Sequence, residues 1–148
     1  MKIYIGSDHA GYELKEKLKV YLGELSYKVK DEGAFELNPT DDYPDFIEKV
    51  ATEVANDEGS MGIVLGGSGE GEAMNANRFE GVRACEFYGG NLDVVKISRE
   101  HNDANILSLG ARFISEEDAK QAVKIFLETK FSGEERHIRR INKLDSND

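Results

Sequence analysis

Apolar residues recur along the chain in two patterns, short runs that predict strands and longer stretches at helical spacing. The runs predict strands, in chain order, at Lys2–Gly6, Tyr27–Asp31, Gly62–Leu65, Val82–Phe87 and Ile106–Gly110. Helical spacing predicts helices over Tyr12–Leu25, Pro44–Val54, Asn91–Glu100, the residues after Ser115 and Glu134–Leu144, and a helical turn over Glu72–Asn77. Ser115, with Asp118 three residues later, is expected to cap the helix that it precedes.

This alternation of strands and helices is typical of an α/β fold, in which helices cover both faces of a parallel sheet. Ligands of such sheets bind beyond the carboxyl ends of the strands, at the point where the strand order reverses. The two most polar, glycine-containing turns, Gly6–Gly11 and Gly66–Gly71, follow the first and third strands. We therefore expect a strand order beginning 2-1-3, which places these turns side by side. The pattern leaves the fourth and fifth strands unplaced.

The length, charge and composition of the chain argue against several classes of protein. A chain of 148 residues suits one domain, spanning residues 1–148. The formal net charge of −10 argues against general binding of nucleic acid, whose phosphates would be repelled. No apolar run approaches the roughly 20 residues that cross a bilayer, and the first residues lack the layout of a signal peptide. The single cysteine, Cys85, excludes an internal disulfide and is expected in the core. We expect a cytoplasmic protein that binds neither nucleic acid nor membrane.

The charge is unevenly distributed. Lys130–Leu144 carries five basic residues against two acidic ones, on a chain that is acidic elsewhere. Arg136 and Arg140 are four residues apart, so on a helix they project from one side. Two neighbouring guanidinium groups suit a phosphate ester, which offers several acceptor oxygens. A solvated helix face is the alternative interpretation of this basic cluster.

The turn after the third predicted strand, Gly66–Glu72, contains four glycines among its first six residues. It is not a P-loop, because Glu72 stands where that motif requires lysine, and it is not the dinucleotide fingerprint. Its backbone N–H groups can still stabilise negative charge. A tight connection between strand and helix is the alternative interpretation, but it needs fewer glycines.

Glu72 is out of place in a loop that only binds phosphate, because its carboxylate would repel that ligand. It can act as a capping residue, since carboxylates are favoured in the first turn of a helix. A carboxylate beside a row of N–H donors is also what an enolising enzyme requires. There the carboxylate removes a carbon-bound proton, and the donors stabilise the enediolate oxygen.

The chain has three histidines, His9, His101 and His137, and no HExxH motif, so we expect no catalytic metal. His9 follows the first strand, where residues that contact ligands gather. His101 opens the segment His-Asn-Asp-Ala-Asn, and His137 lies in the basic cluster. Taken singly, either His9 or His101 is more often a surface or core histidine than a functional one.

Several long motifs resemble the type B ribose-5-phosphate isomerases, a family that also includes the galactose-6-phosphate isomerase subunits. The motifs are IGSDHAGYELKE near the start, DDYPDF at Asp41–Phe46, GIVLGGSGEGEAMNANR at Gly62–Arg78 and SREHNDANIL at Ser98–Leu107. The similarity continues through GARFIS and RHIRRI, so it covers essentially the whole chain. The resemblance implies a Rossmann-like three-layer α/β/α sandwich with a five-stranded parallel sheet and a C-terminal helix.

The resemblance also implies the reaction. Members of this family interconvert ribose 5-phosphate and ribulose 5-phosphate, a step of the pentose phosphate pathway, without a metal or other cofactor. They form homodimers, in some members tetramers, and each active site is built from two subunits.

Carried onto this sequence, the family's motifs assign roles to particular residues. Asp8 and His9 are expected in the substrate pocket. An anion hole is expected from Gly67, Ser68, Gly69, Glu70 and Gly71, with Ser68 bonding a reacting sugar oxygen.

The catalytic and phosphate-binding roles are assigned in the same way. Glu72 is expected to be the base that moves a proton between the first two carbons. His101 is expected to assist opening of the furanose ring, with Asn102 beside it. The resemblance further implies that the partner chain contributes substrate and phosphate contacts from Arg112, Arg136 and Arg140.

One position departs from many relatives. They have a catalytic cysteine where this chain has Gly66. A second branch of the family resembles this chain, with glycine at that place and glutamate at the position of Glu72. Open alternatives are an isomerase of galactose 6-phosphate, allose 6-phosphate or a tetrose phosphate, a non-catalytic sensor of sugar phosphates, and a scaffold.

Overall fold

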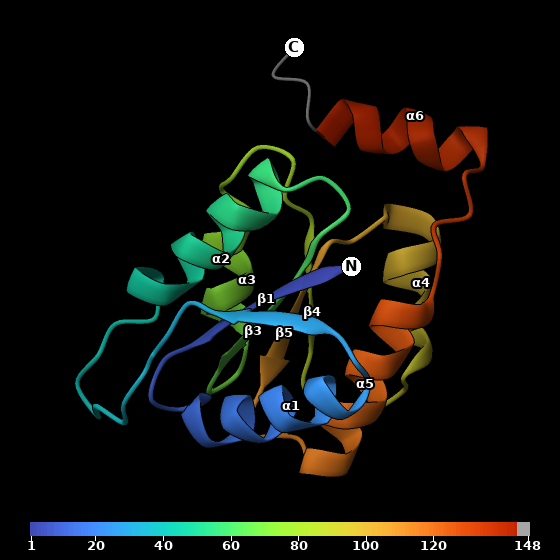
Figure 1. The fold of residues 1–148 in the computed structure, drawn as a ribbon. Helices are drawn as coiled ribbons and strands as arrows, with labels where there is room; N and C mark the ends of the chain where they lie inside the picture. The colour runs from blue at the N-terminus through green and yellow to red at the C-terminus, as the bar shows by residue number, and fades with distance from the viewer. Residues whose placement is uncertain (145–148) are drawn as a thin grey trace.

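The computed structural model describes residues 1–144, which form a parallel sheet and its covering helices (Figure 1). The strands are β1 (Lys2–Ser7), β2 (Lys28–Asp31), β3 (Met61–Gly66), β4 (Ala84–Phe87) and β5 (Ile106–Gly110). The helices are α1 (Tyr12–Glu24), α2 (Pro44–Asn56), α3 (Glu70–Ala76), α4 (Asp93–Asn102), α5 (Glu116–Glu128) and α6 (Glu135–Leu144). All strand pairs are parallel, in the order β2-β1-β3-β5-β4.

The central strands are buried on both faces, because alternate side chains enter two separate apolar cores. From β3, Ile63 and Leu65 pack with α1, α4 and α5 in the larger core. Val64 points the other way and packs with α2 and α3. Figure 1 shows the two groups of helices on opposite sides of the sheet. The predicted three-layer α/β/α sandwich with five parallel strands is confirmed.

The expected strand order beginning 2-1-3 is also confirmed. Ser7 of β1 pairs with Leu65 of β3, so the turns after these strands leave the sheet side by side. The two strands that the sequence left unplaced follow as β5 and then β4, with β4 at the edge. The Ser115 hydroxyl caps α5 as expected, accepting the Asp118 N–H at 3.1 Å. Helix α3 begins at Glu70, two residues before the predicted helical turn.

An ion pair at the end of β2 fixes the start of the loop that leads to α2. The buried Lys15 ammonium lies 2.7 Å from Asp31 Oδ2, and the Gly33 N–H donates to Asp31 Oδ1 at 2.9 Å. Burial raises the pKa of the Asp31 carboxyl, but Lys15 and Lys19 more than offset this effect and the pKa is lowered. The loop is then joined to the end of β1, because Ser7 N–H donates to Gly33 O and Ala34 N–H donates to Ser7 O, both at 2.7 Å.

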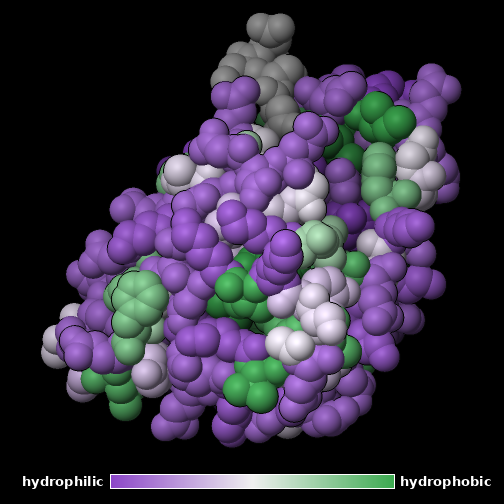
Figure 2. Space-filling view, in the orientation of Figure 1, coloured by the Kyte–Doolittle hydropathy of each residue, from purple (hydrophilic) through white to green (hydrophobic). Residues whose placement is uncertain are grey.

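Helix α6 stands apart from the two helical layers, near the C-terminal end of α4 (Figure 1). Its buried residue is His137, whose ring stacks on that of His101 in α4 with centroids 4.4 Å apart. Figure 2 shows a mostly hydrophilic face, on which the apolar side chains form separate groups. Within residues 1–144, no helix combines the length and hydropathy that a membrane span requires.

Candidate active site

Three turns meet at the carboxyl edge of the sheet, around the point where the strand order reverses. Asp8 and His9 follow β1, and Gly67–Gly71 follows β3. Arg112 follows β5, and its N–H donates to Gly67 O at 3.0 Å. The Arg112 guanidinium lies beside the same glycine, because a β-carbon on Gly67 would be 3.2 Å from Nη1.

Arg112 therefore belongs to the same edge as the glycine loop of its own chain. The resemblance assigned it to the partner's contribution, and within one chain it already lies beside the glycine loop. The reason is the strand order, since β5 lies directly beside β3 and its following turn reaches the glycine loop.

The Glu72 carboxylate is buried at this edge, with 3% of the residue exposed. It occupies the space beside Gly66, so that a β-carbon on Gly66 would overlap the carboxylate. Burial raises the pKa of Glu72, and the nearby Asp8 charge raises it further. Hydrogen bonds from the Glu72 and Gly69 backbone N–H groups act in the opposite direction, but burial dominates. The result is a carboxyl group that holds its proton more strongly than an ordinary glutamate.

The glycine loop is held in one conformation by bonds from a neighbouring strand and from itself. Gly69 is the N-terminal capping residue of α3, with φ of 85°, in the left-handed region that favours glycine. Its carbonyl accepts the buried Ser108 hydroxyl at 2.6 Å. Ser68 Oγ accepts the Glu70 N–H at 3.3 Å. The loop therefore presents a defined set of backbone groups next to Glu72.

The turn after β1 holds an acid and a histidine side by side. Asp8 is 8% exposed, and its Oδ1 accepts the N–H groups of Ala10 and Gly11 at 2.9 and 3.2 Å. The His9 ring points to another carboxylate, with Nδ1 2.6 Å from Asp41 Oδ1. The His9 N–H donates to that same Oδ1 at 3.0 Å. Asp8 and His9 thus lie at the edge where the sequence predicted the substrate pocket.

Asp8, His9 and Asp41 also form the one group among residues 1–144 whose ligating atoms could hold a metal ion. These atoms lie within 4.8 Å of one another. A short hydrogen bond already joins His9 to Asp41, and Asp8 is engaged with two backbone N–H groups. The hydrogen bonds account for the cluster without a cation.

The remaining predicted site residues lie at the opposite edge of the sheet. Helix α4 runs back from the carboxyl end of β4, so His101 and Asn102 at its end approach the amino end of β5. Arg136 and Arg140 lie on α6, which packs against α4 through the stacked rings of His101 and His137. One chain therefore does not bring these four residues together with Glu72.

The two arginines of this group, and His137 that stacks on His101, have distinct surroundings. Arg136 and Arg140 are exposed, and Arg136 Nε donates to Glu134 Oε2 at 2.8 Å. Burial lowers the pKa of His137, and the nearby His101 and Arg136 lower it further. A neutral His137 can stack on His101 without charge repulsion. The basic face of α6 is thus presented outward from a helix that is fixed to α4.

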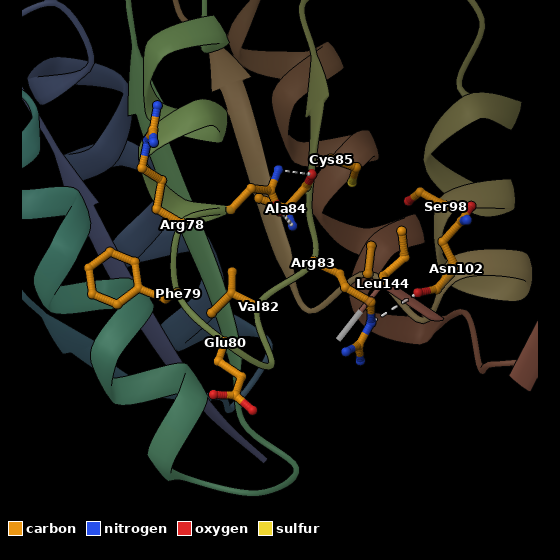
Figure 3. A pocket seen from close by; sticks show the side chains of 12 residues that line it. Arg78, Phe79, Glu80, Val82, Arg83, Ala84, Cys85, Ser98, Asn102 and Leu144 are labelled. Carbon is orange, nitrogen blue, oxygen red and sulfur yellow. Dashed lines mark hydrogen bonds between the residues drawn. The ribbon is translucent and has the colours of Figure 1, made fainter. Parts of the chain in front are cut away.

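His101, Asn102, Arg136 and Arg140 are called the second group below. A cavity of about 570 Å³ lies beside this group (Figure 3). Asn102 and Ser98 of α4 line one side, and Arg78 and Phe79 after α3 line the other. Arg83 crosses between them, and its Nε donates to Asn102 O at 3.1 Å. Neither Glu72 nor the glycine loop lines this cavity. Its place next to Asn102 and the edge strand β4 connects it with the second group instead.

Three residues of the glycine-loop edge were not singled out from the sequence. Asp41 holds His9, and Ser108 holds Gly69. The Tyr43 ring packs over Gly71, where a β-carbon would lie 2.8 Å from Tyr43 Cζ. Asp41 and Tyr43 belong to the motif DDYPDF, so their place in a long motif was the available signal. Ser108 lies within an apolar strand, and no pattern in the sequence indicated that it contacts the glycine loop.

The Glu72 carboxyl group lies beside a glycine-rich turn at the switch point of a Rossmann-like sheet, and its pKa is raised. This arrangement is typical of α/β enzymes that use acid–base chemistry on small polar ligands. The comparison with known families is more specific. The chain belongs to the family described as Ribose/Galactose Isomerase, which matches residues 3–144.

Relatives and solved structures agree with this assignment. Ribose-5-phosphate isomerase B of Mycobacterium leprae (strain TN) is 40% identical over 144 residues, covering 97% of this chain and 88% of the relative. The Clostridium thermocellum ribose-5-phosphate isomerase B structure has a TM-score of 0.92 and 43% identity, covering 98% of this chain and 95% of that chain. The Mycoplasma genitalium enzyme, solved with bound ribulose-5-phosphate, has a TM-score of 0.91 and 35% identity, covering 97% and 93%. The chain is therefore an isomerase.

Proposed function

We propose that this chain is an aldose-ketose isomerase that interconverts D-ribose 5-phosphate and D-ribulose 5-phosphate in the cytoplasm. The observation that carries the proposal is the buried Glu72 carboxyl group beside the glycine loop. The relatives that bear the name ribose-5-phosphate isomerase B, one of them with ribulose-5-phosphate bound, support the choice of substrate.

In the proposed reaction, the furanose first opens, because only the open aldehyde has an acidic hydrogen at C2. The Glu72 carboxylate removes that proton, and the C1 carbonyl oxygen takes the electron pair as a cis-enediolate. A proton moves from the C2 oxygen to the C1 oxygen, and Glu72 returns its own proton to C1. The C2 oxygen becomes the ketose carbonyl, so atoms and electrons balance.

The oxygen charge of the enediolate needs stabilisation. Ser68 and the loop amides are the proposed donors, with an effect of roughly 3 to 4 kcal/mol per donor in comparable sites. Asp8 and His9, on the neighbouring turn, are proposed to bind substrate hydroxyl groups. No metal or cofactor enters this sequence of steps.

The position of the Glu72 carboxylate supports its role as the base. Many family members resemble this chain except for a catalytic cysteine at the place of Gly66. Here the carboxylate fills the space that a side chain at position 66 would enter. A glutamate reaching into this space can thus replace the thiol of the other branch at the same place in the site.

The second group of residues is proposed to act on a substrate held by another copy of the chain. His101 opens the furanose ring, Asn102 lies beside it, and Arg136 and Arg140 bind the phosphate. Their separation from Glu72 supports a homodimer with shared active sites, with a tetramer as a further assembly. The outward-facing basic side chains of α6 agree with this arrangement, since they are exposed within one chain.

The experiment that tests the function is an assay with phosphorylated pentoses, tetroses and hexoses, followed by deuterium exchange at C2 in D₂O. We expect conversion of ribose 5-phosphate to ribulose 5-phosphate with exchange at C2, unchanged after treatment with EDTA. Faster turnover of galactose 6-phosphate, allose 6-phosphate or a tetrose phosphate would reassign the substrate. Binding without conversion or exchange would indicate a sensor.

We expect the Arg136→Ala and Arg140→Ala variants to raise KM by about 10- to 100-fold each, with a much smaller change in kcat. The reason is that a hydrogen bond to a charged group contributes about 1.5–3 kcal/mol. Steady-state kinetics with ribose 5-phosphate measure both constants. Arg139→Ala is the matched control, because Arg139 lies between them on α6 and is also exposed. A fall in kcat at unchanged KM would contradict the phosphate-binding role.

A further inference from the structure

The His9 side chain is held by a carboxylate from a segment 32 residues away in the chain. Asp41 Oδ1 lies 2.6 Å from the ring Nδ1 and accepts the His9 backbone N–H at 3.0 Å. A carboxylate only accepts hydrogen bonds, so Nδ1 is the ring nitrogen that carries the proton in this contact. The other ring nitrogen, Nε2, is then left for a ligand, and the His9 side chain is 29% exposed.

The hydrogen bonds that the Asp41 carboxylate accepts in the structure of residues 1–144 come from His9. Its side chain is only 7% exposed, and its Oδ2 is buried without a hydrogen-bond partner within residues 1–144. A buried, half-satisfied carboxylate is unfavourable by itself, because burial removes its hydration. The ring Nδ1 and the backbone N–H of His9 both contact Asp41 Oδ1. These two contacts indicate that the carboxylate fixes the position of His9.

The loop that carries Asp41 is built to keep it in place. Its start is bonded to the end of β1 through Gly33 and Ala34, directly before Asp8 and His9. Its end is fixed where Phe46 N–H donates to Tyr43 O at 3.1 Å, at the start of α2. The carboxylate thus approaches His9 from an anchored loop.

We propose that Asp41 is a positioning residue for His9, fixing the imidazole with its proton on Nδ1 and its Nε2 directed to a hydroxyl group of the sugar phosphate. This inference rests on the proposed function, because it assigns His9 a contact with the substrate. Partners of this kind set the tautomer and the orientation of a histidine ring, and replacing aspartate with asparagine can reverse the tautomer. In an Asp41→Asn variant, the side-chain amide can donate to Nδ1, which would leave the proton on Nε2.

The test begins with the unmodified chain. Nitrogen-15 NMR of the histidine rings, recorded at a pH where they are neutral, reports which nitrogen carries the proton. We expect the His9 signal to show the Nδ1–H tautomer, and to shift toward the Nε2–H tautomer in Asp41→Asn. The Nε2–H tautomer in the unmodified chain would overturn the inference, whether or not any variant folds. This measurement does not depend on activity, so it remains decisive if the proposed substrate is wrong.

Kinetics then show whether Asp41 acts through His9. We expect Asp41→Asn to lower kcat/KM by about 10-fold or more, as for other carboxylate partners of functional histidines. In a His9→Gln background the same substitution should have no further effect, because its target is gone. Asp42→Asn is the matched control, since Asp42 is exposed and its replacement removes the same charge from the same loop. Unchanged kcat/KM in Asp41→Asn, or an equal loss in both backgrounds, would overturn the inference while leaving the isomerase assignment intact.

Discussion

The Glu72→Gln variant is expected to lose about 10³-fold or more in kcat with little change in KM, since general base catalysis contributes about 10²–10⁴-fold. Glutamine has the same shape as glutamate and can still accept the backbone N–H bonds, but it cannot remove a proton from carbon. The proposed substrate contacts from Asp8, His9 and the glycine loop are unchanged in this variant. Deuterium exchange at C2 should disappear together with turnover. Near-normal kcat in this variant would refute Glu72 as the base.

The pH dependence of kcat gives an independent measurement of the same group. The base must be deprotonated, so kcat falls as the pH drops through the pKa of Glu72. Because burial raises that pKa, the fall should begin at a higher pH than for an ordinary glutamate. Glu24→Gln is the control, because Glu24 is an exposed carboxyl group at the end of α1, which returns to the opposite edge of the sheet. This variant should keep both kcat and the acid limb.

A second substitution tests the position of the carboxylate while leaving it chemically intact. A methyl group on Gly66 would overlap the Glu72 carboxylate, so Gly66→Ala should displace it and lower kcat severely. Gly23→Ala is the control for losing a glycine, because a β-carbon there meets nothing within 4 Å. Normal kcat in a folded Gly66→Ala variant would mean that the carboxylate need not occupy this place.

The sequence predicted the parts of the fold that depend on local patterns. The apolar runs of β1, β3 and β5 are buried in the structure, and the Ser115 cap forms as expected. The position of the switch point was predicted from the two polar turns, because ligands of parallel sheets bind where the strand order reverses. The places of β4 and β5 did not follow, because they depend on packing between distant segments.

The limits of the site prediction have similar causes. Glu72 was predicted as a base because its carboxylate conflicts with a loop that only binds phosphate, and this role stays a prediction. The direction of its pKa shift needed the structure, since burial and backbone hydrogen bonds oppose each other. Asp41 reaches His9 across 32 residues, and no local pattern encodes that contact. The separation of His101 from Glu72 was implicit in the topology, because a helix that follows a parallel strand returns to the opposite edge.

That separation leads to the second large effect, recovery of activity on mixing two inactive variants. The five residues of β5 span roughly 16 Å between the edges of the sheet, too far for one pentose phosphate to touch both groups in one chain. If the groups meet across a homodimer, Glu72→Gln damages one half of every site and His101→Asn damages the other half. A mixed dimer then has one site with both defects and one site with neither.

We expect the mixture of Glu72→Gln and His101→Asn, unfolded and refolded together at equal amounts, to recover about one quarter of the wild-type activity. Half of the randomly formed dimers are mixed, and half of their sites are intact. Glu72→Gln mixed with Gly66→Ala is the matched control, because both defects lie in the same half and no intact site can form. Subunit exchange is verified by capturing two different tags together. Mixed dimers without recovered activity would show that each site is built within one chain, and that His101 does not serve the Glu72 of a partner.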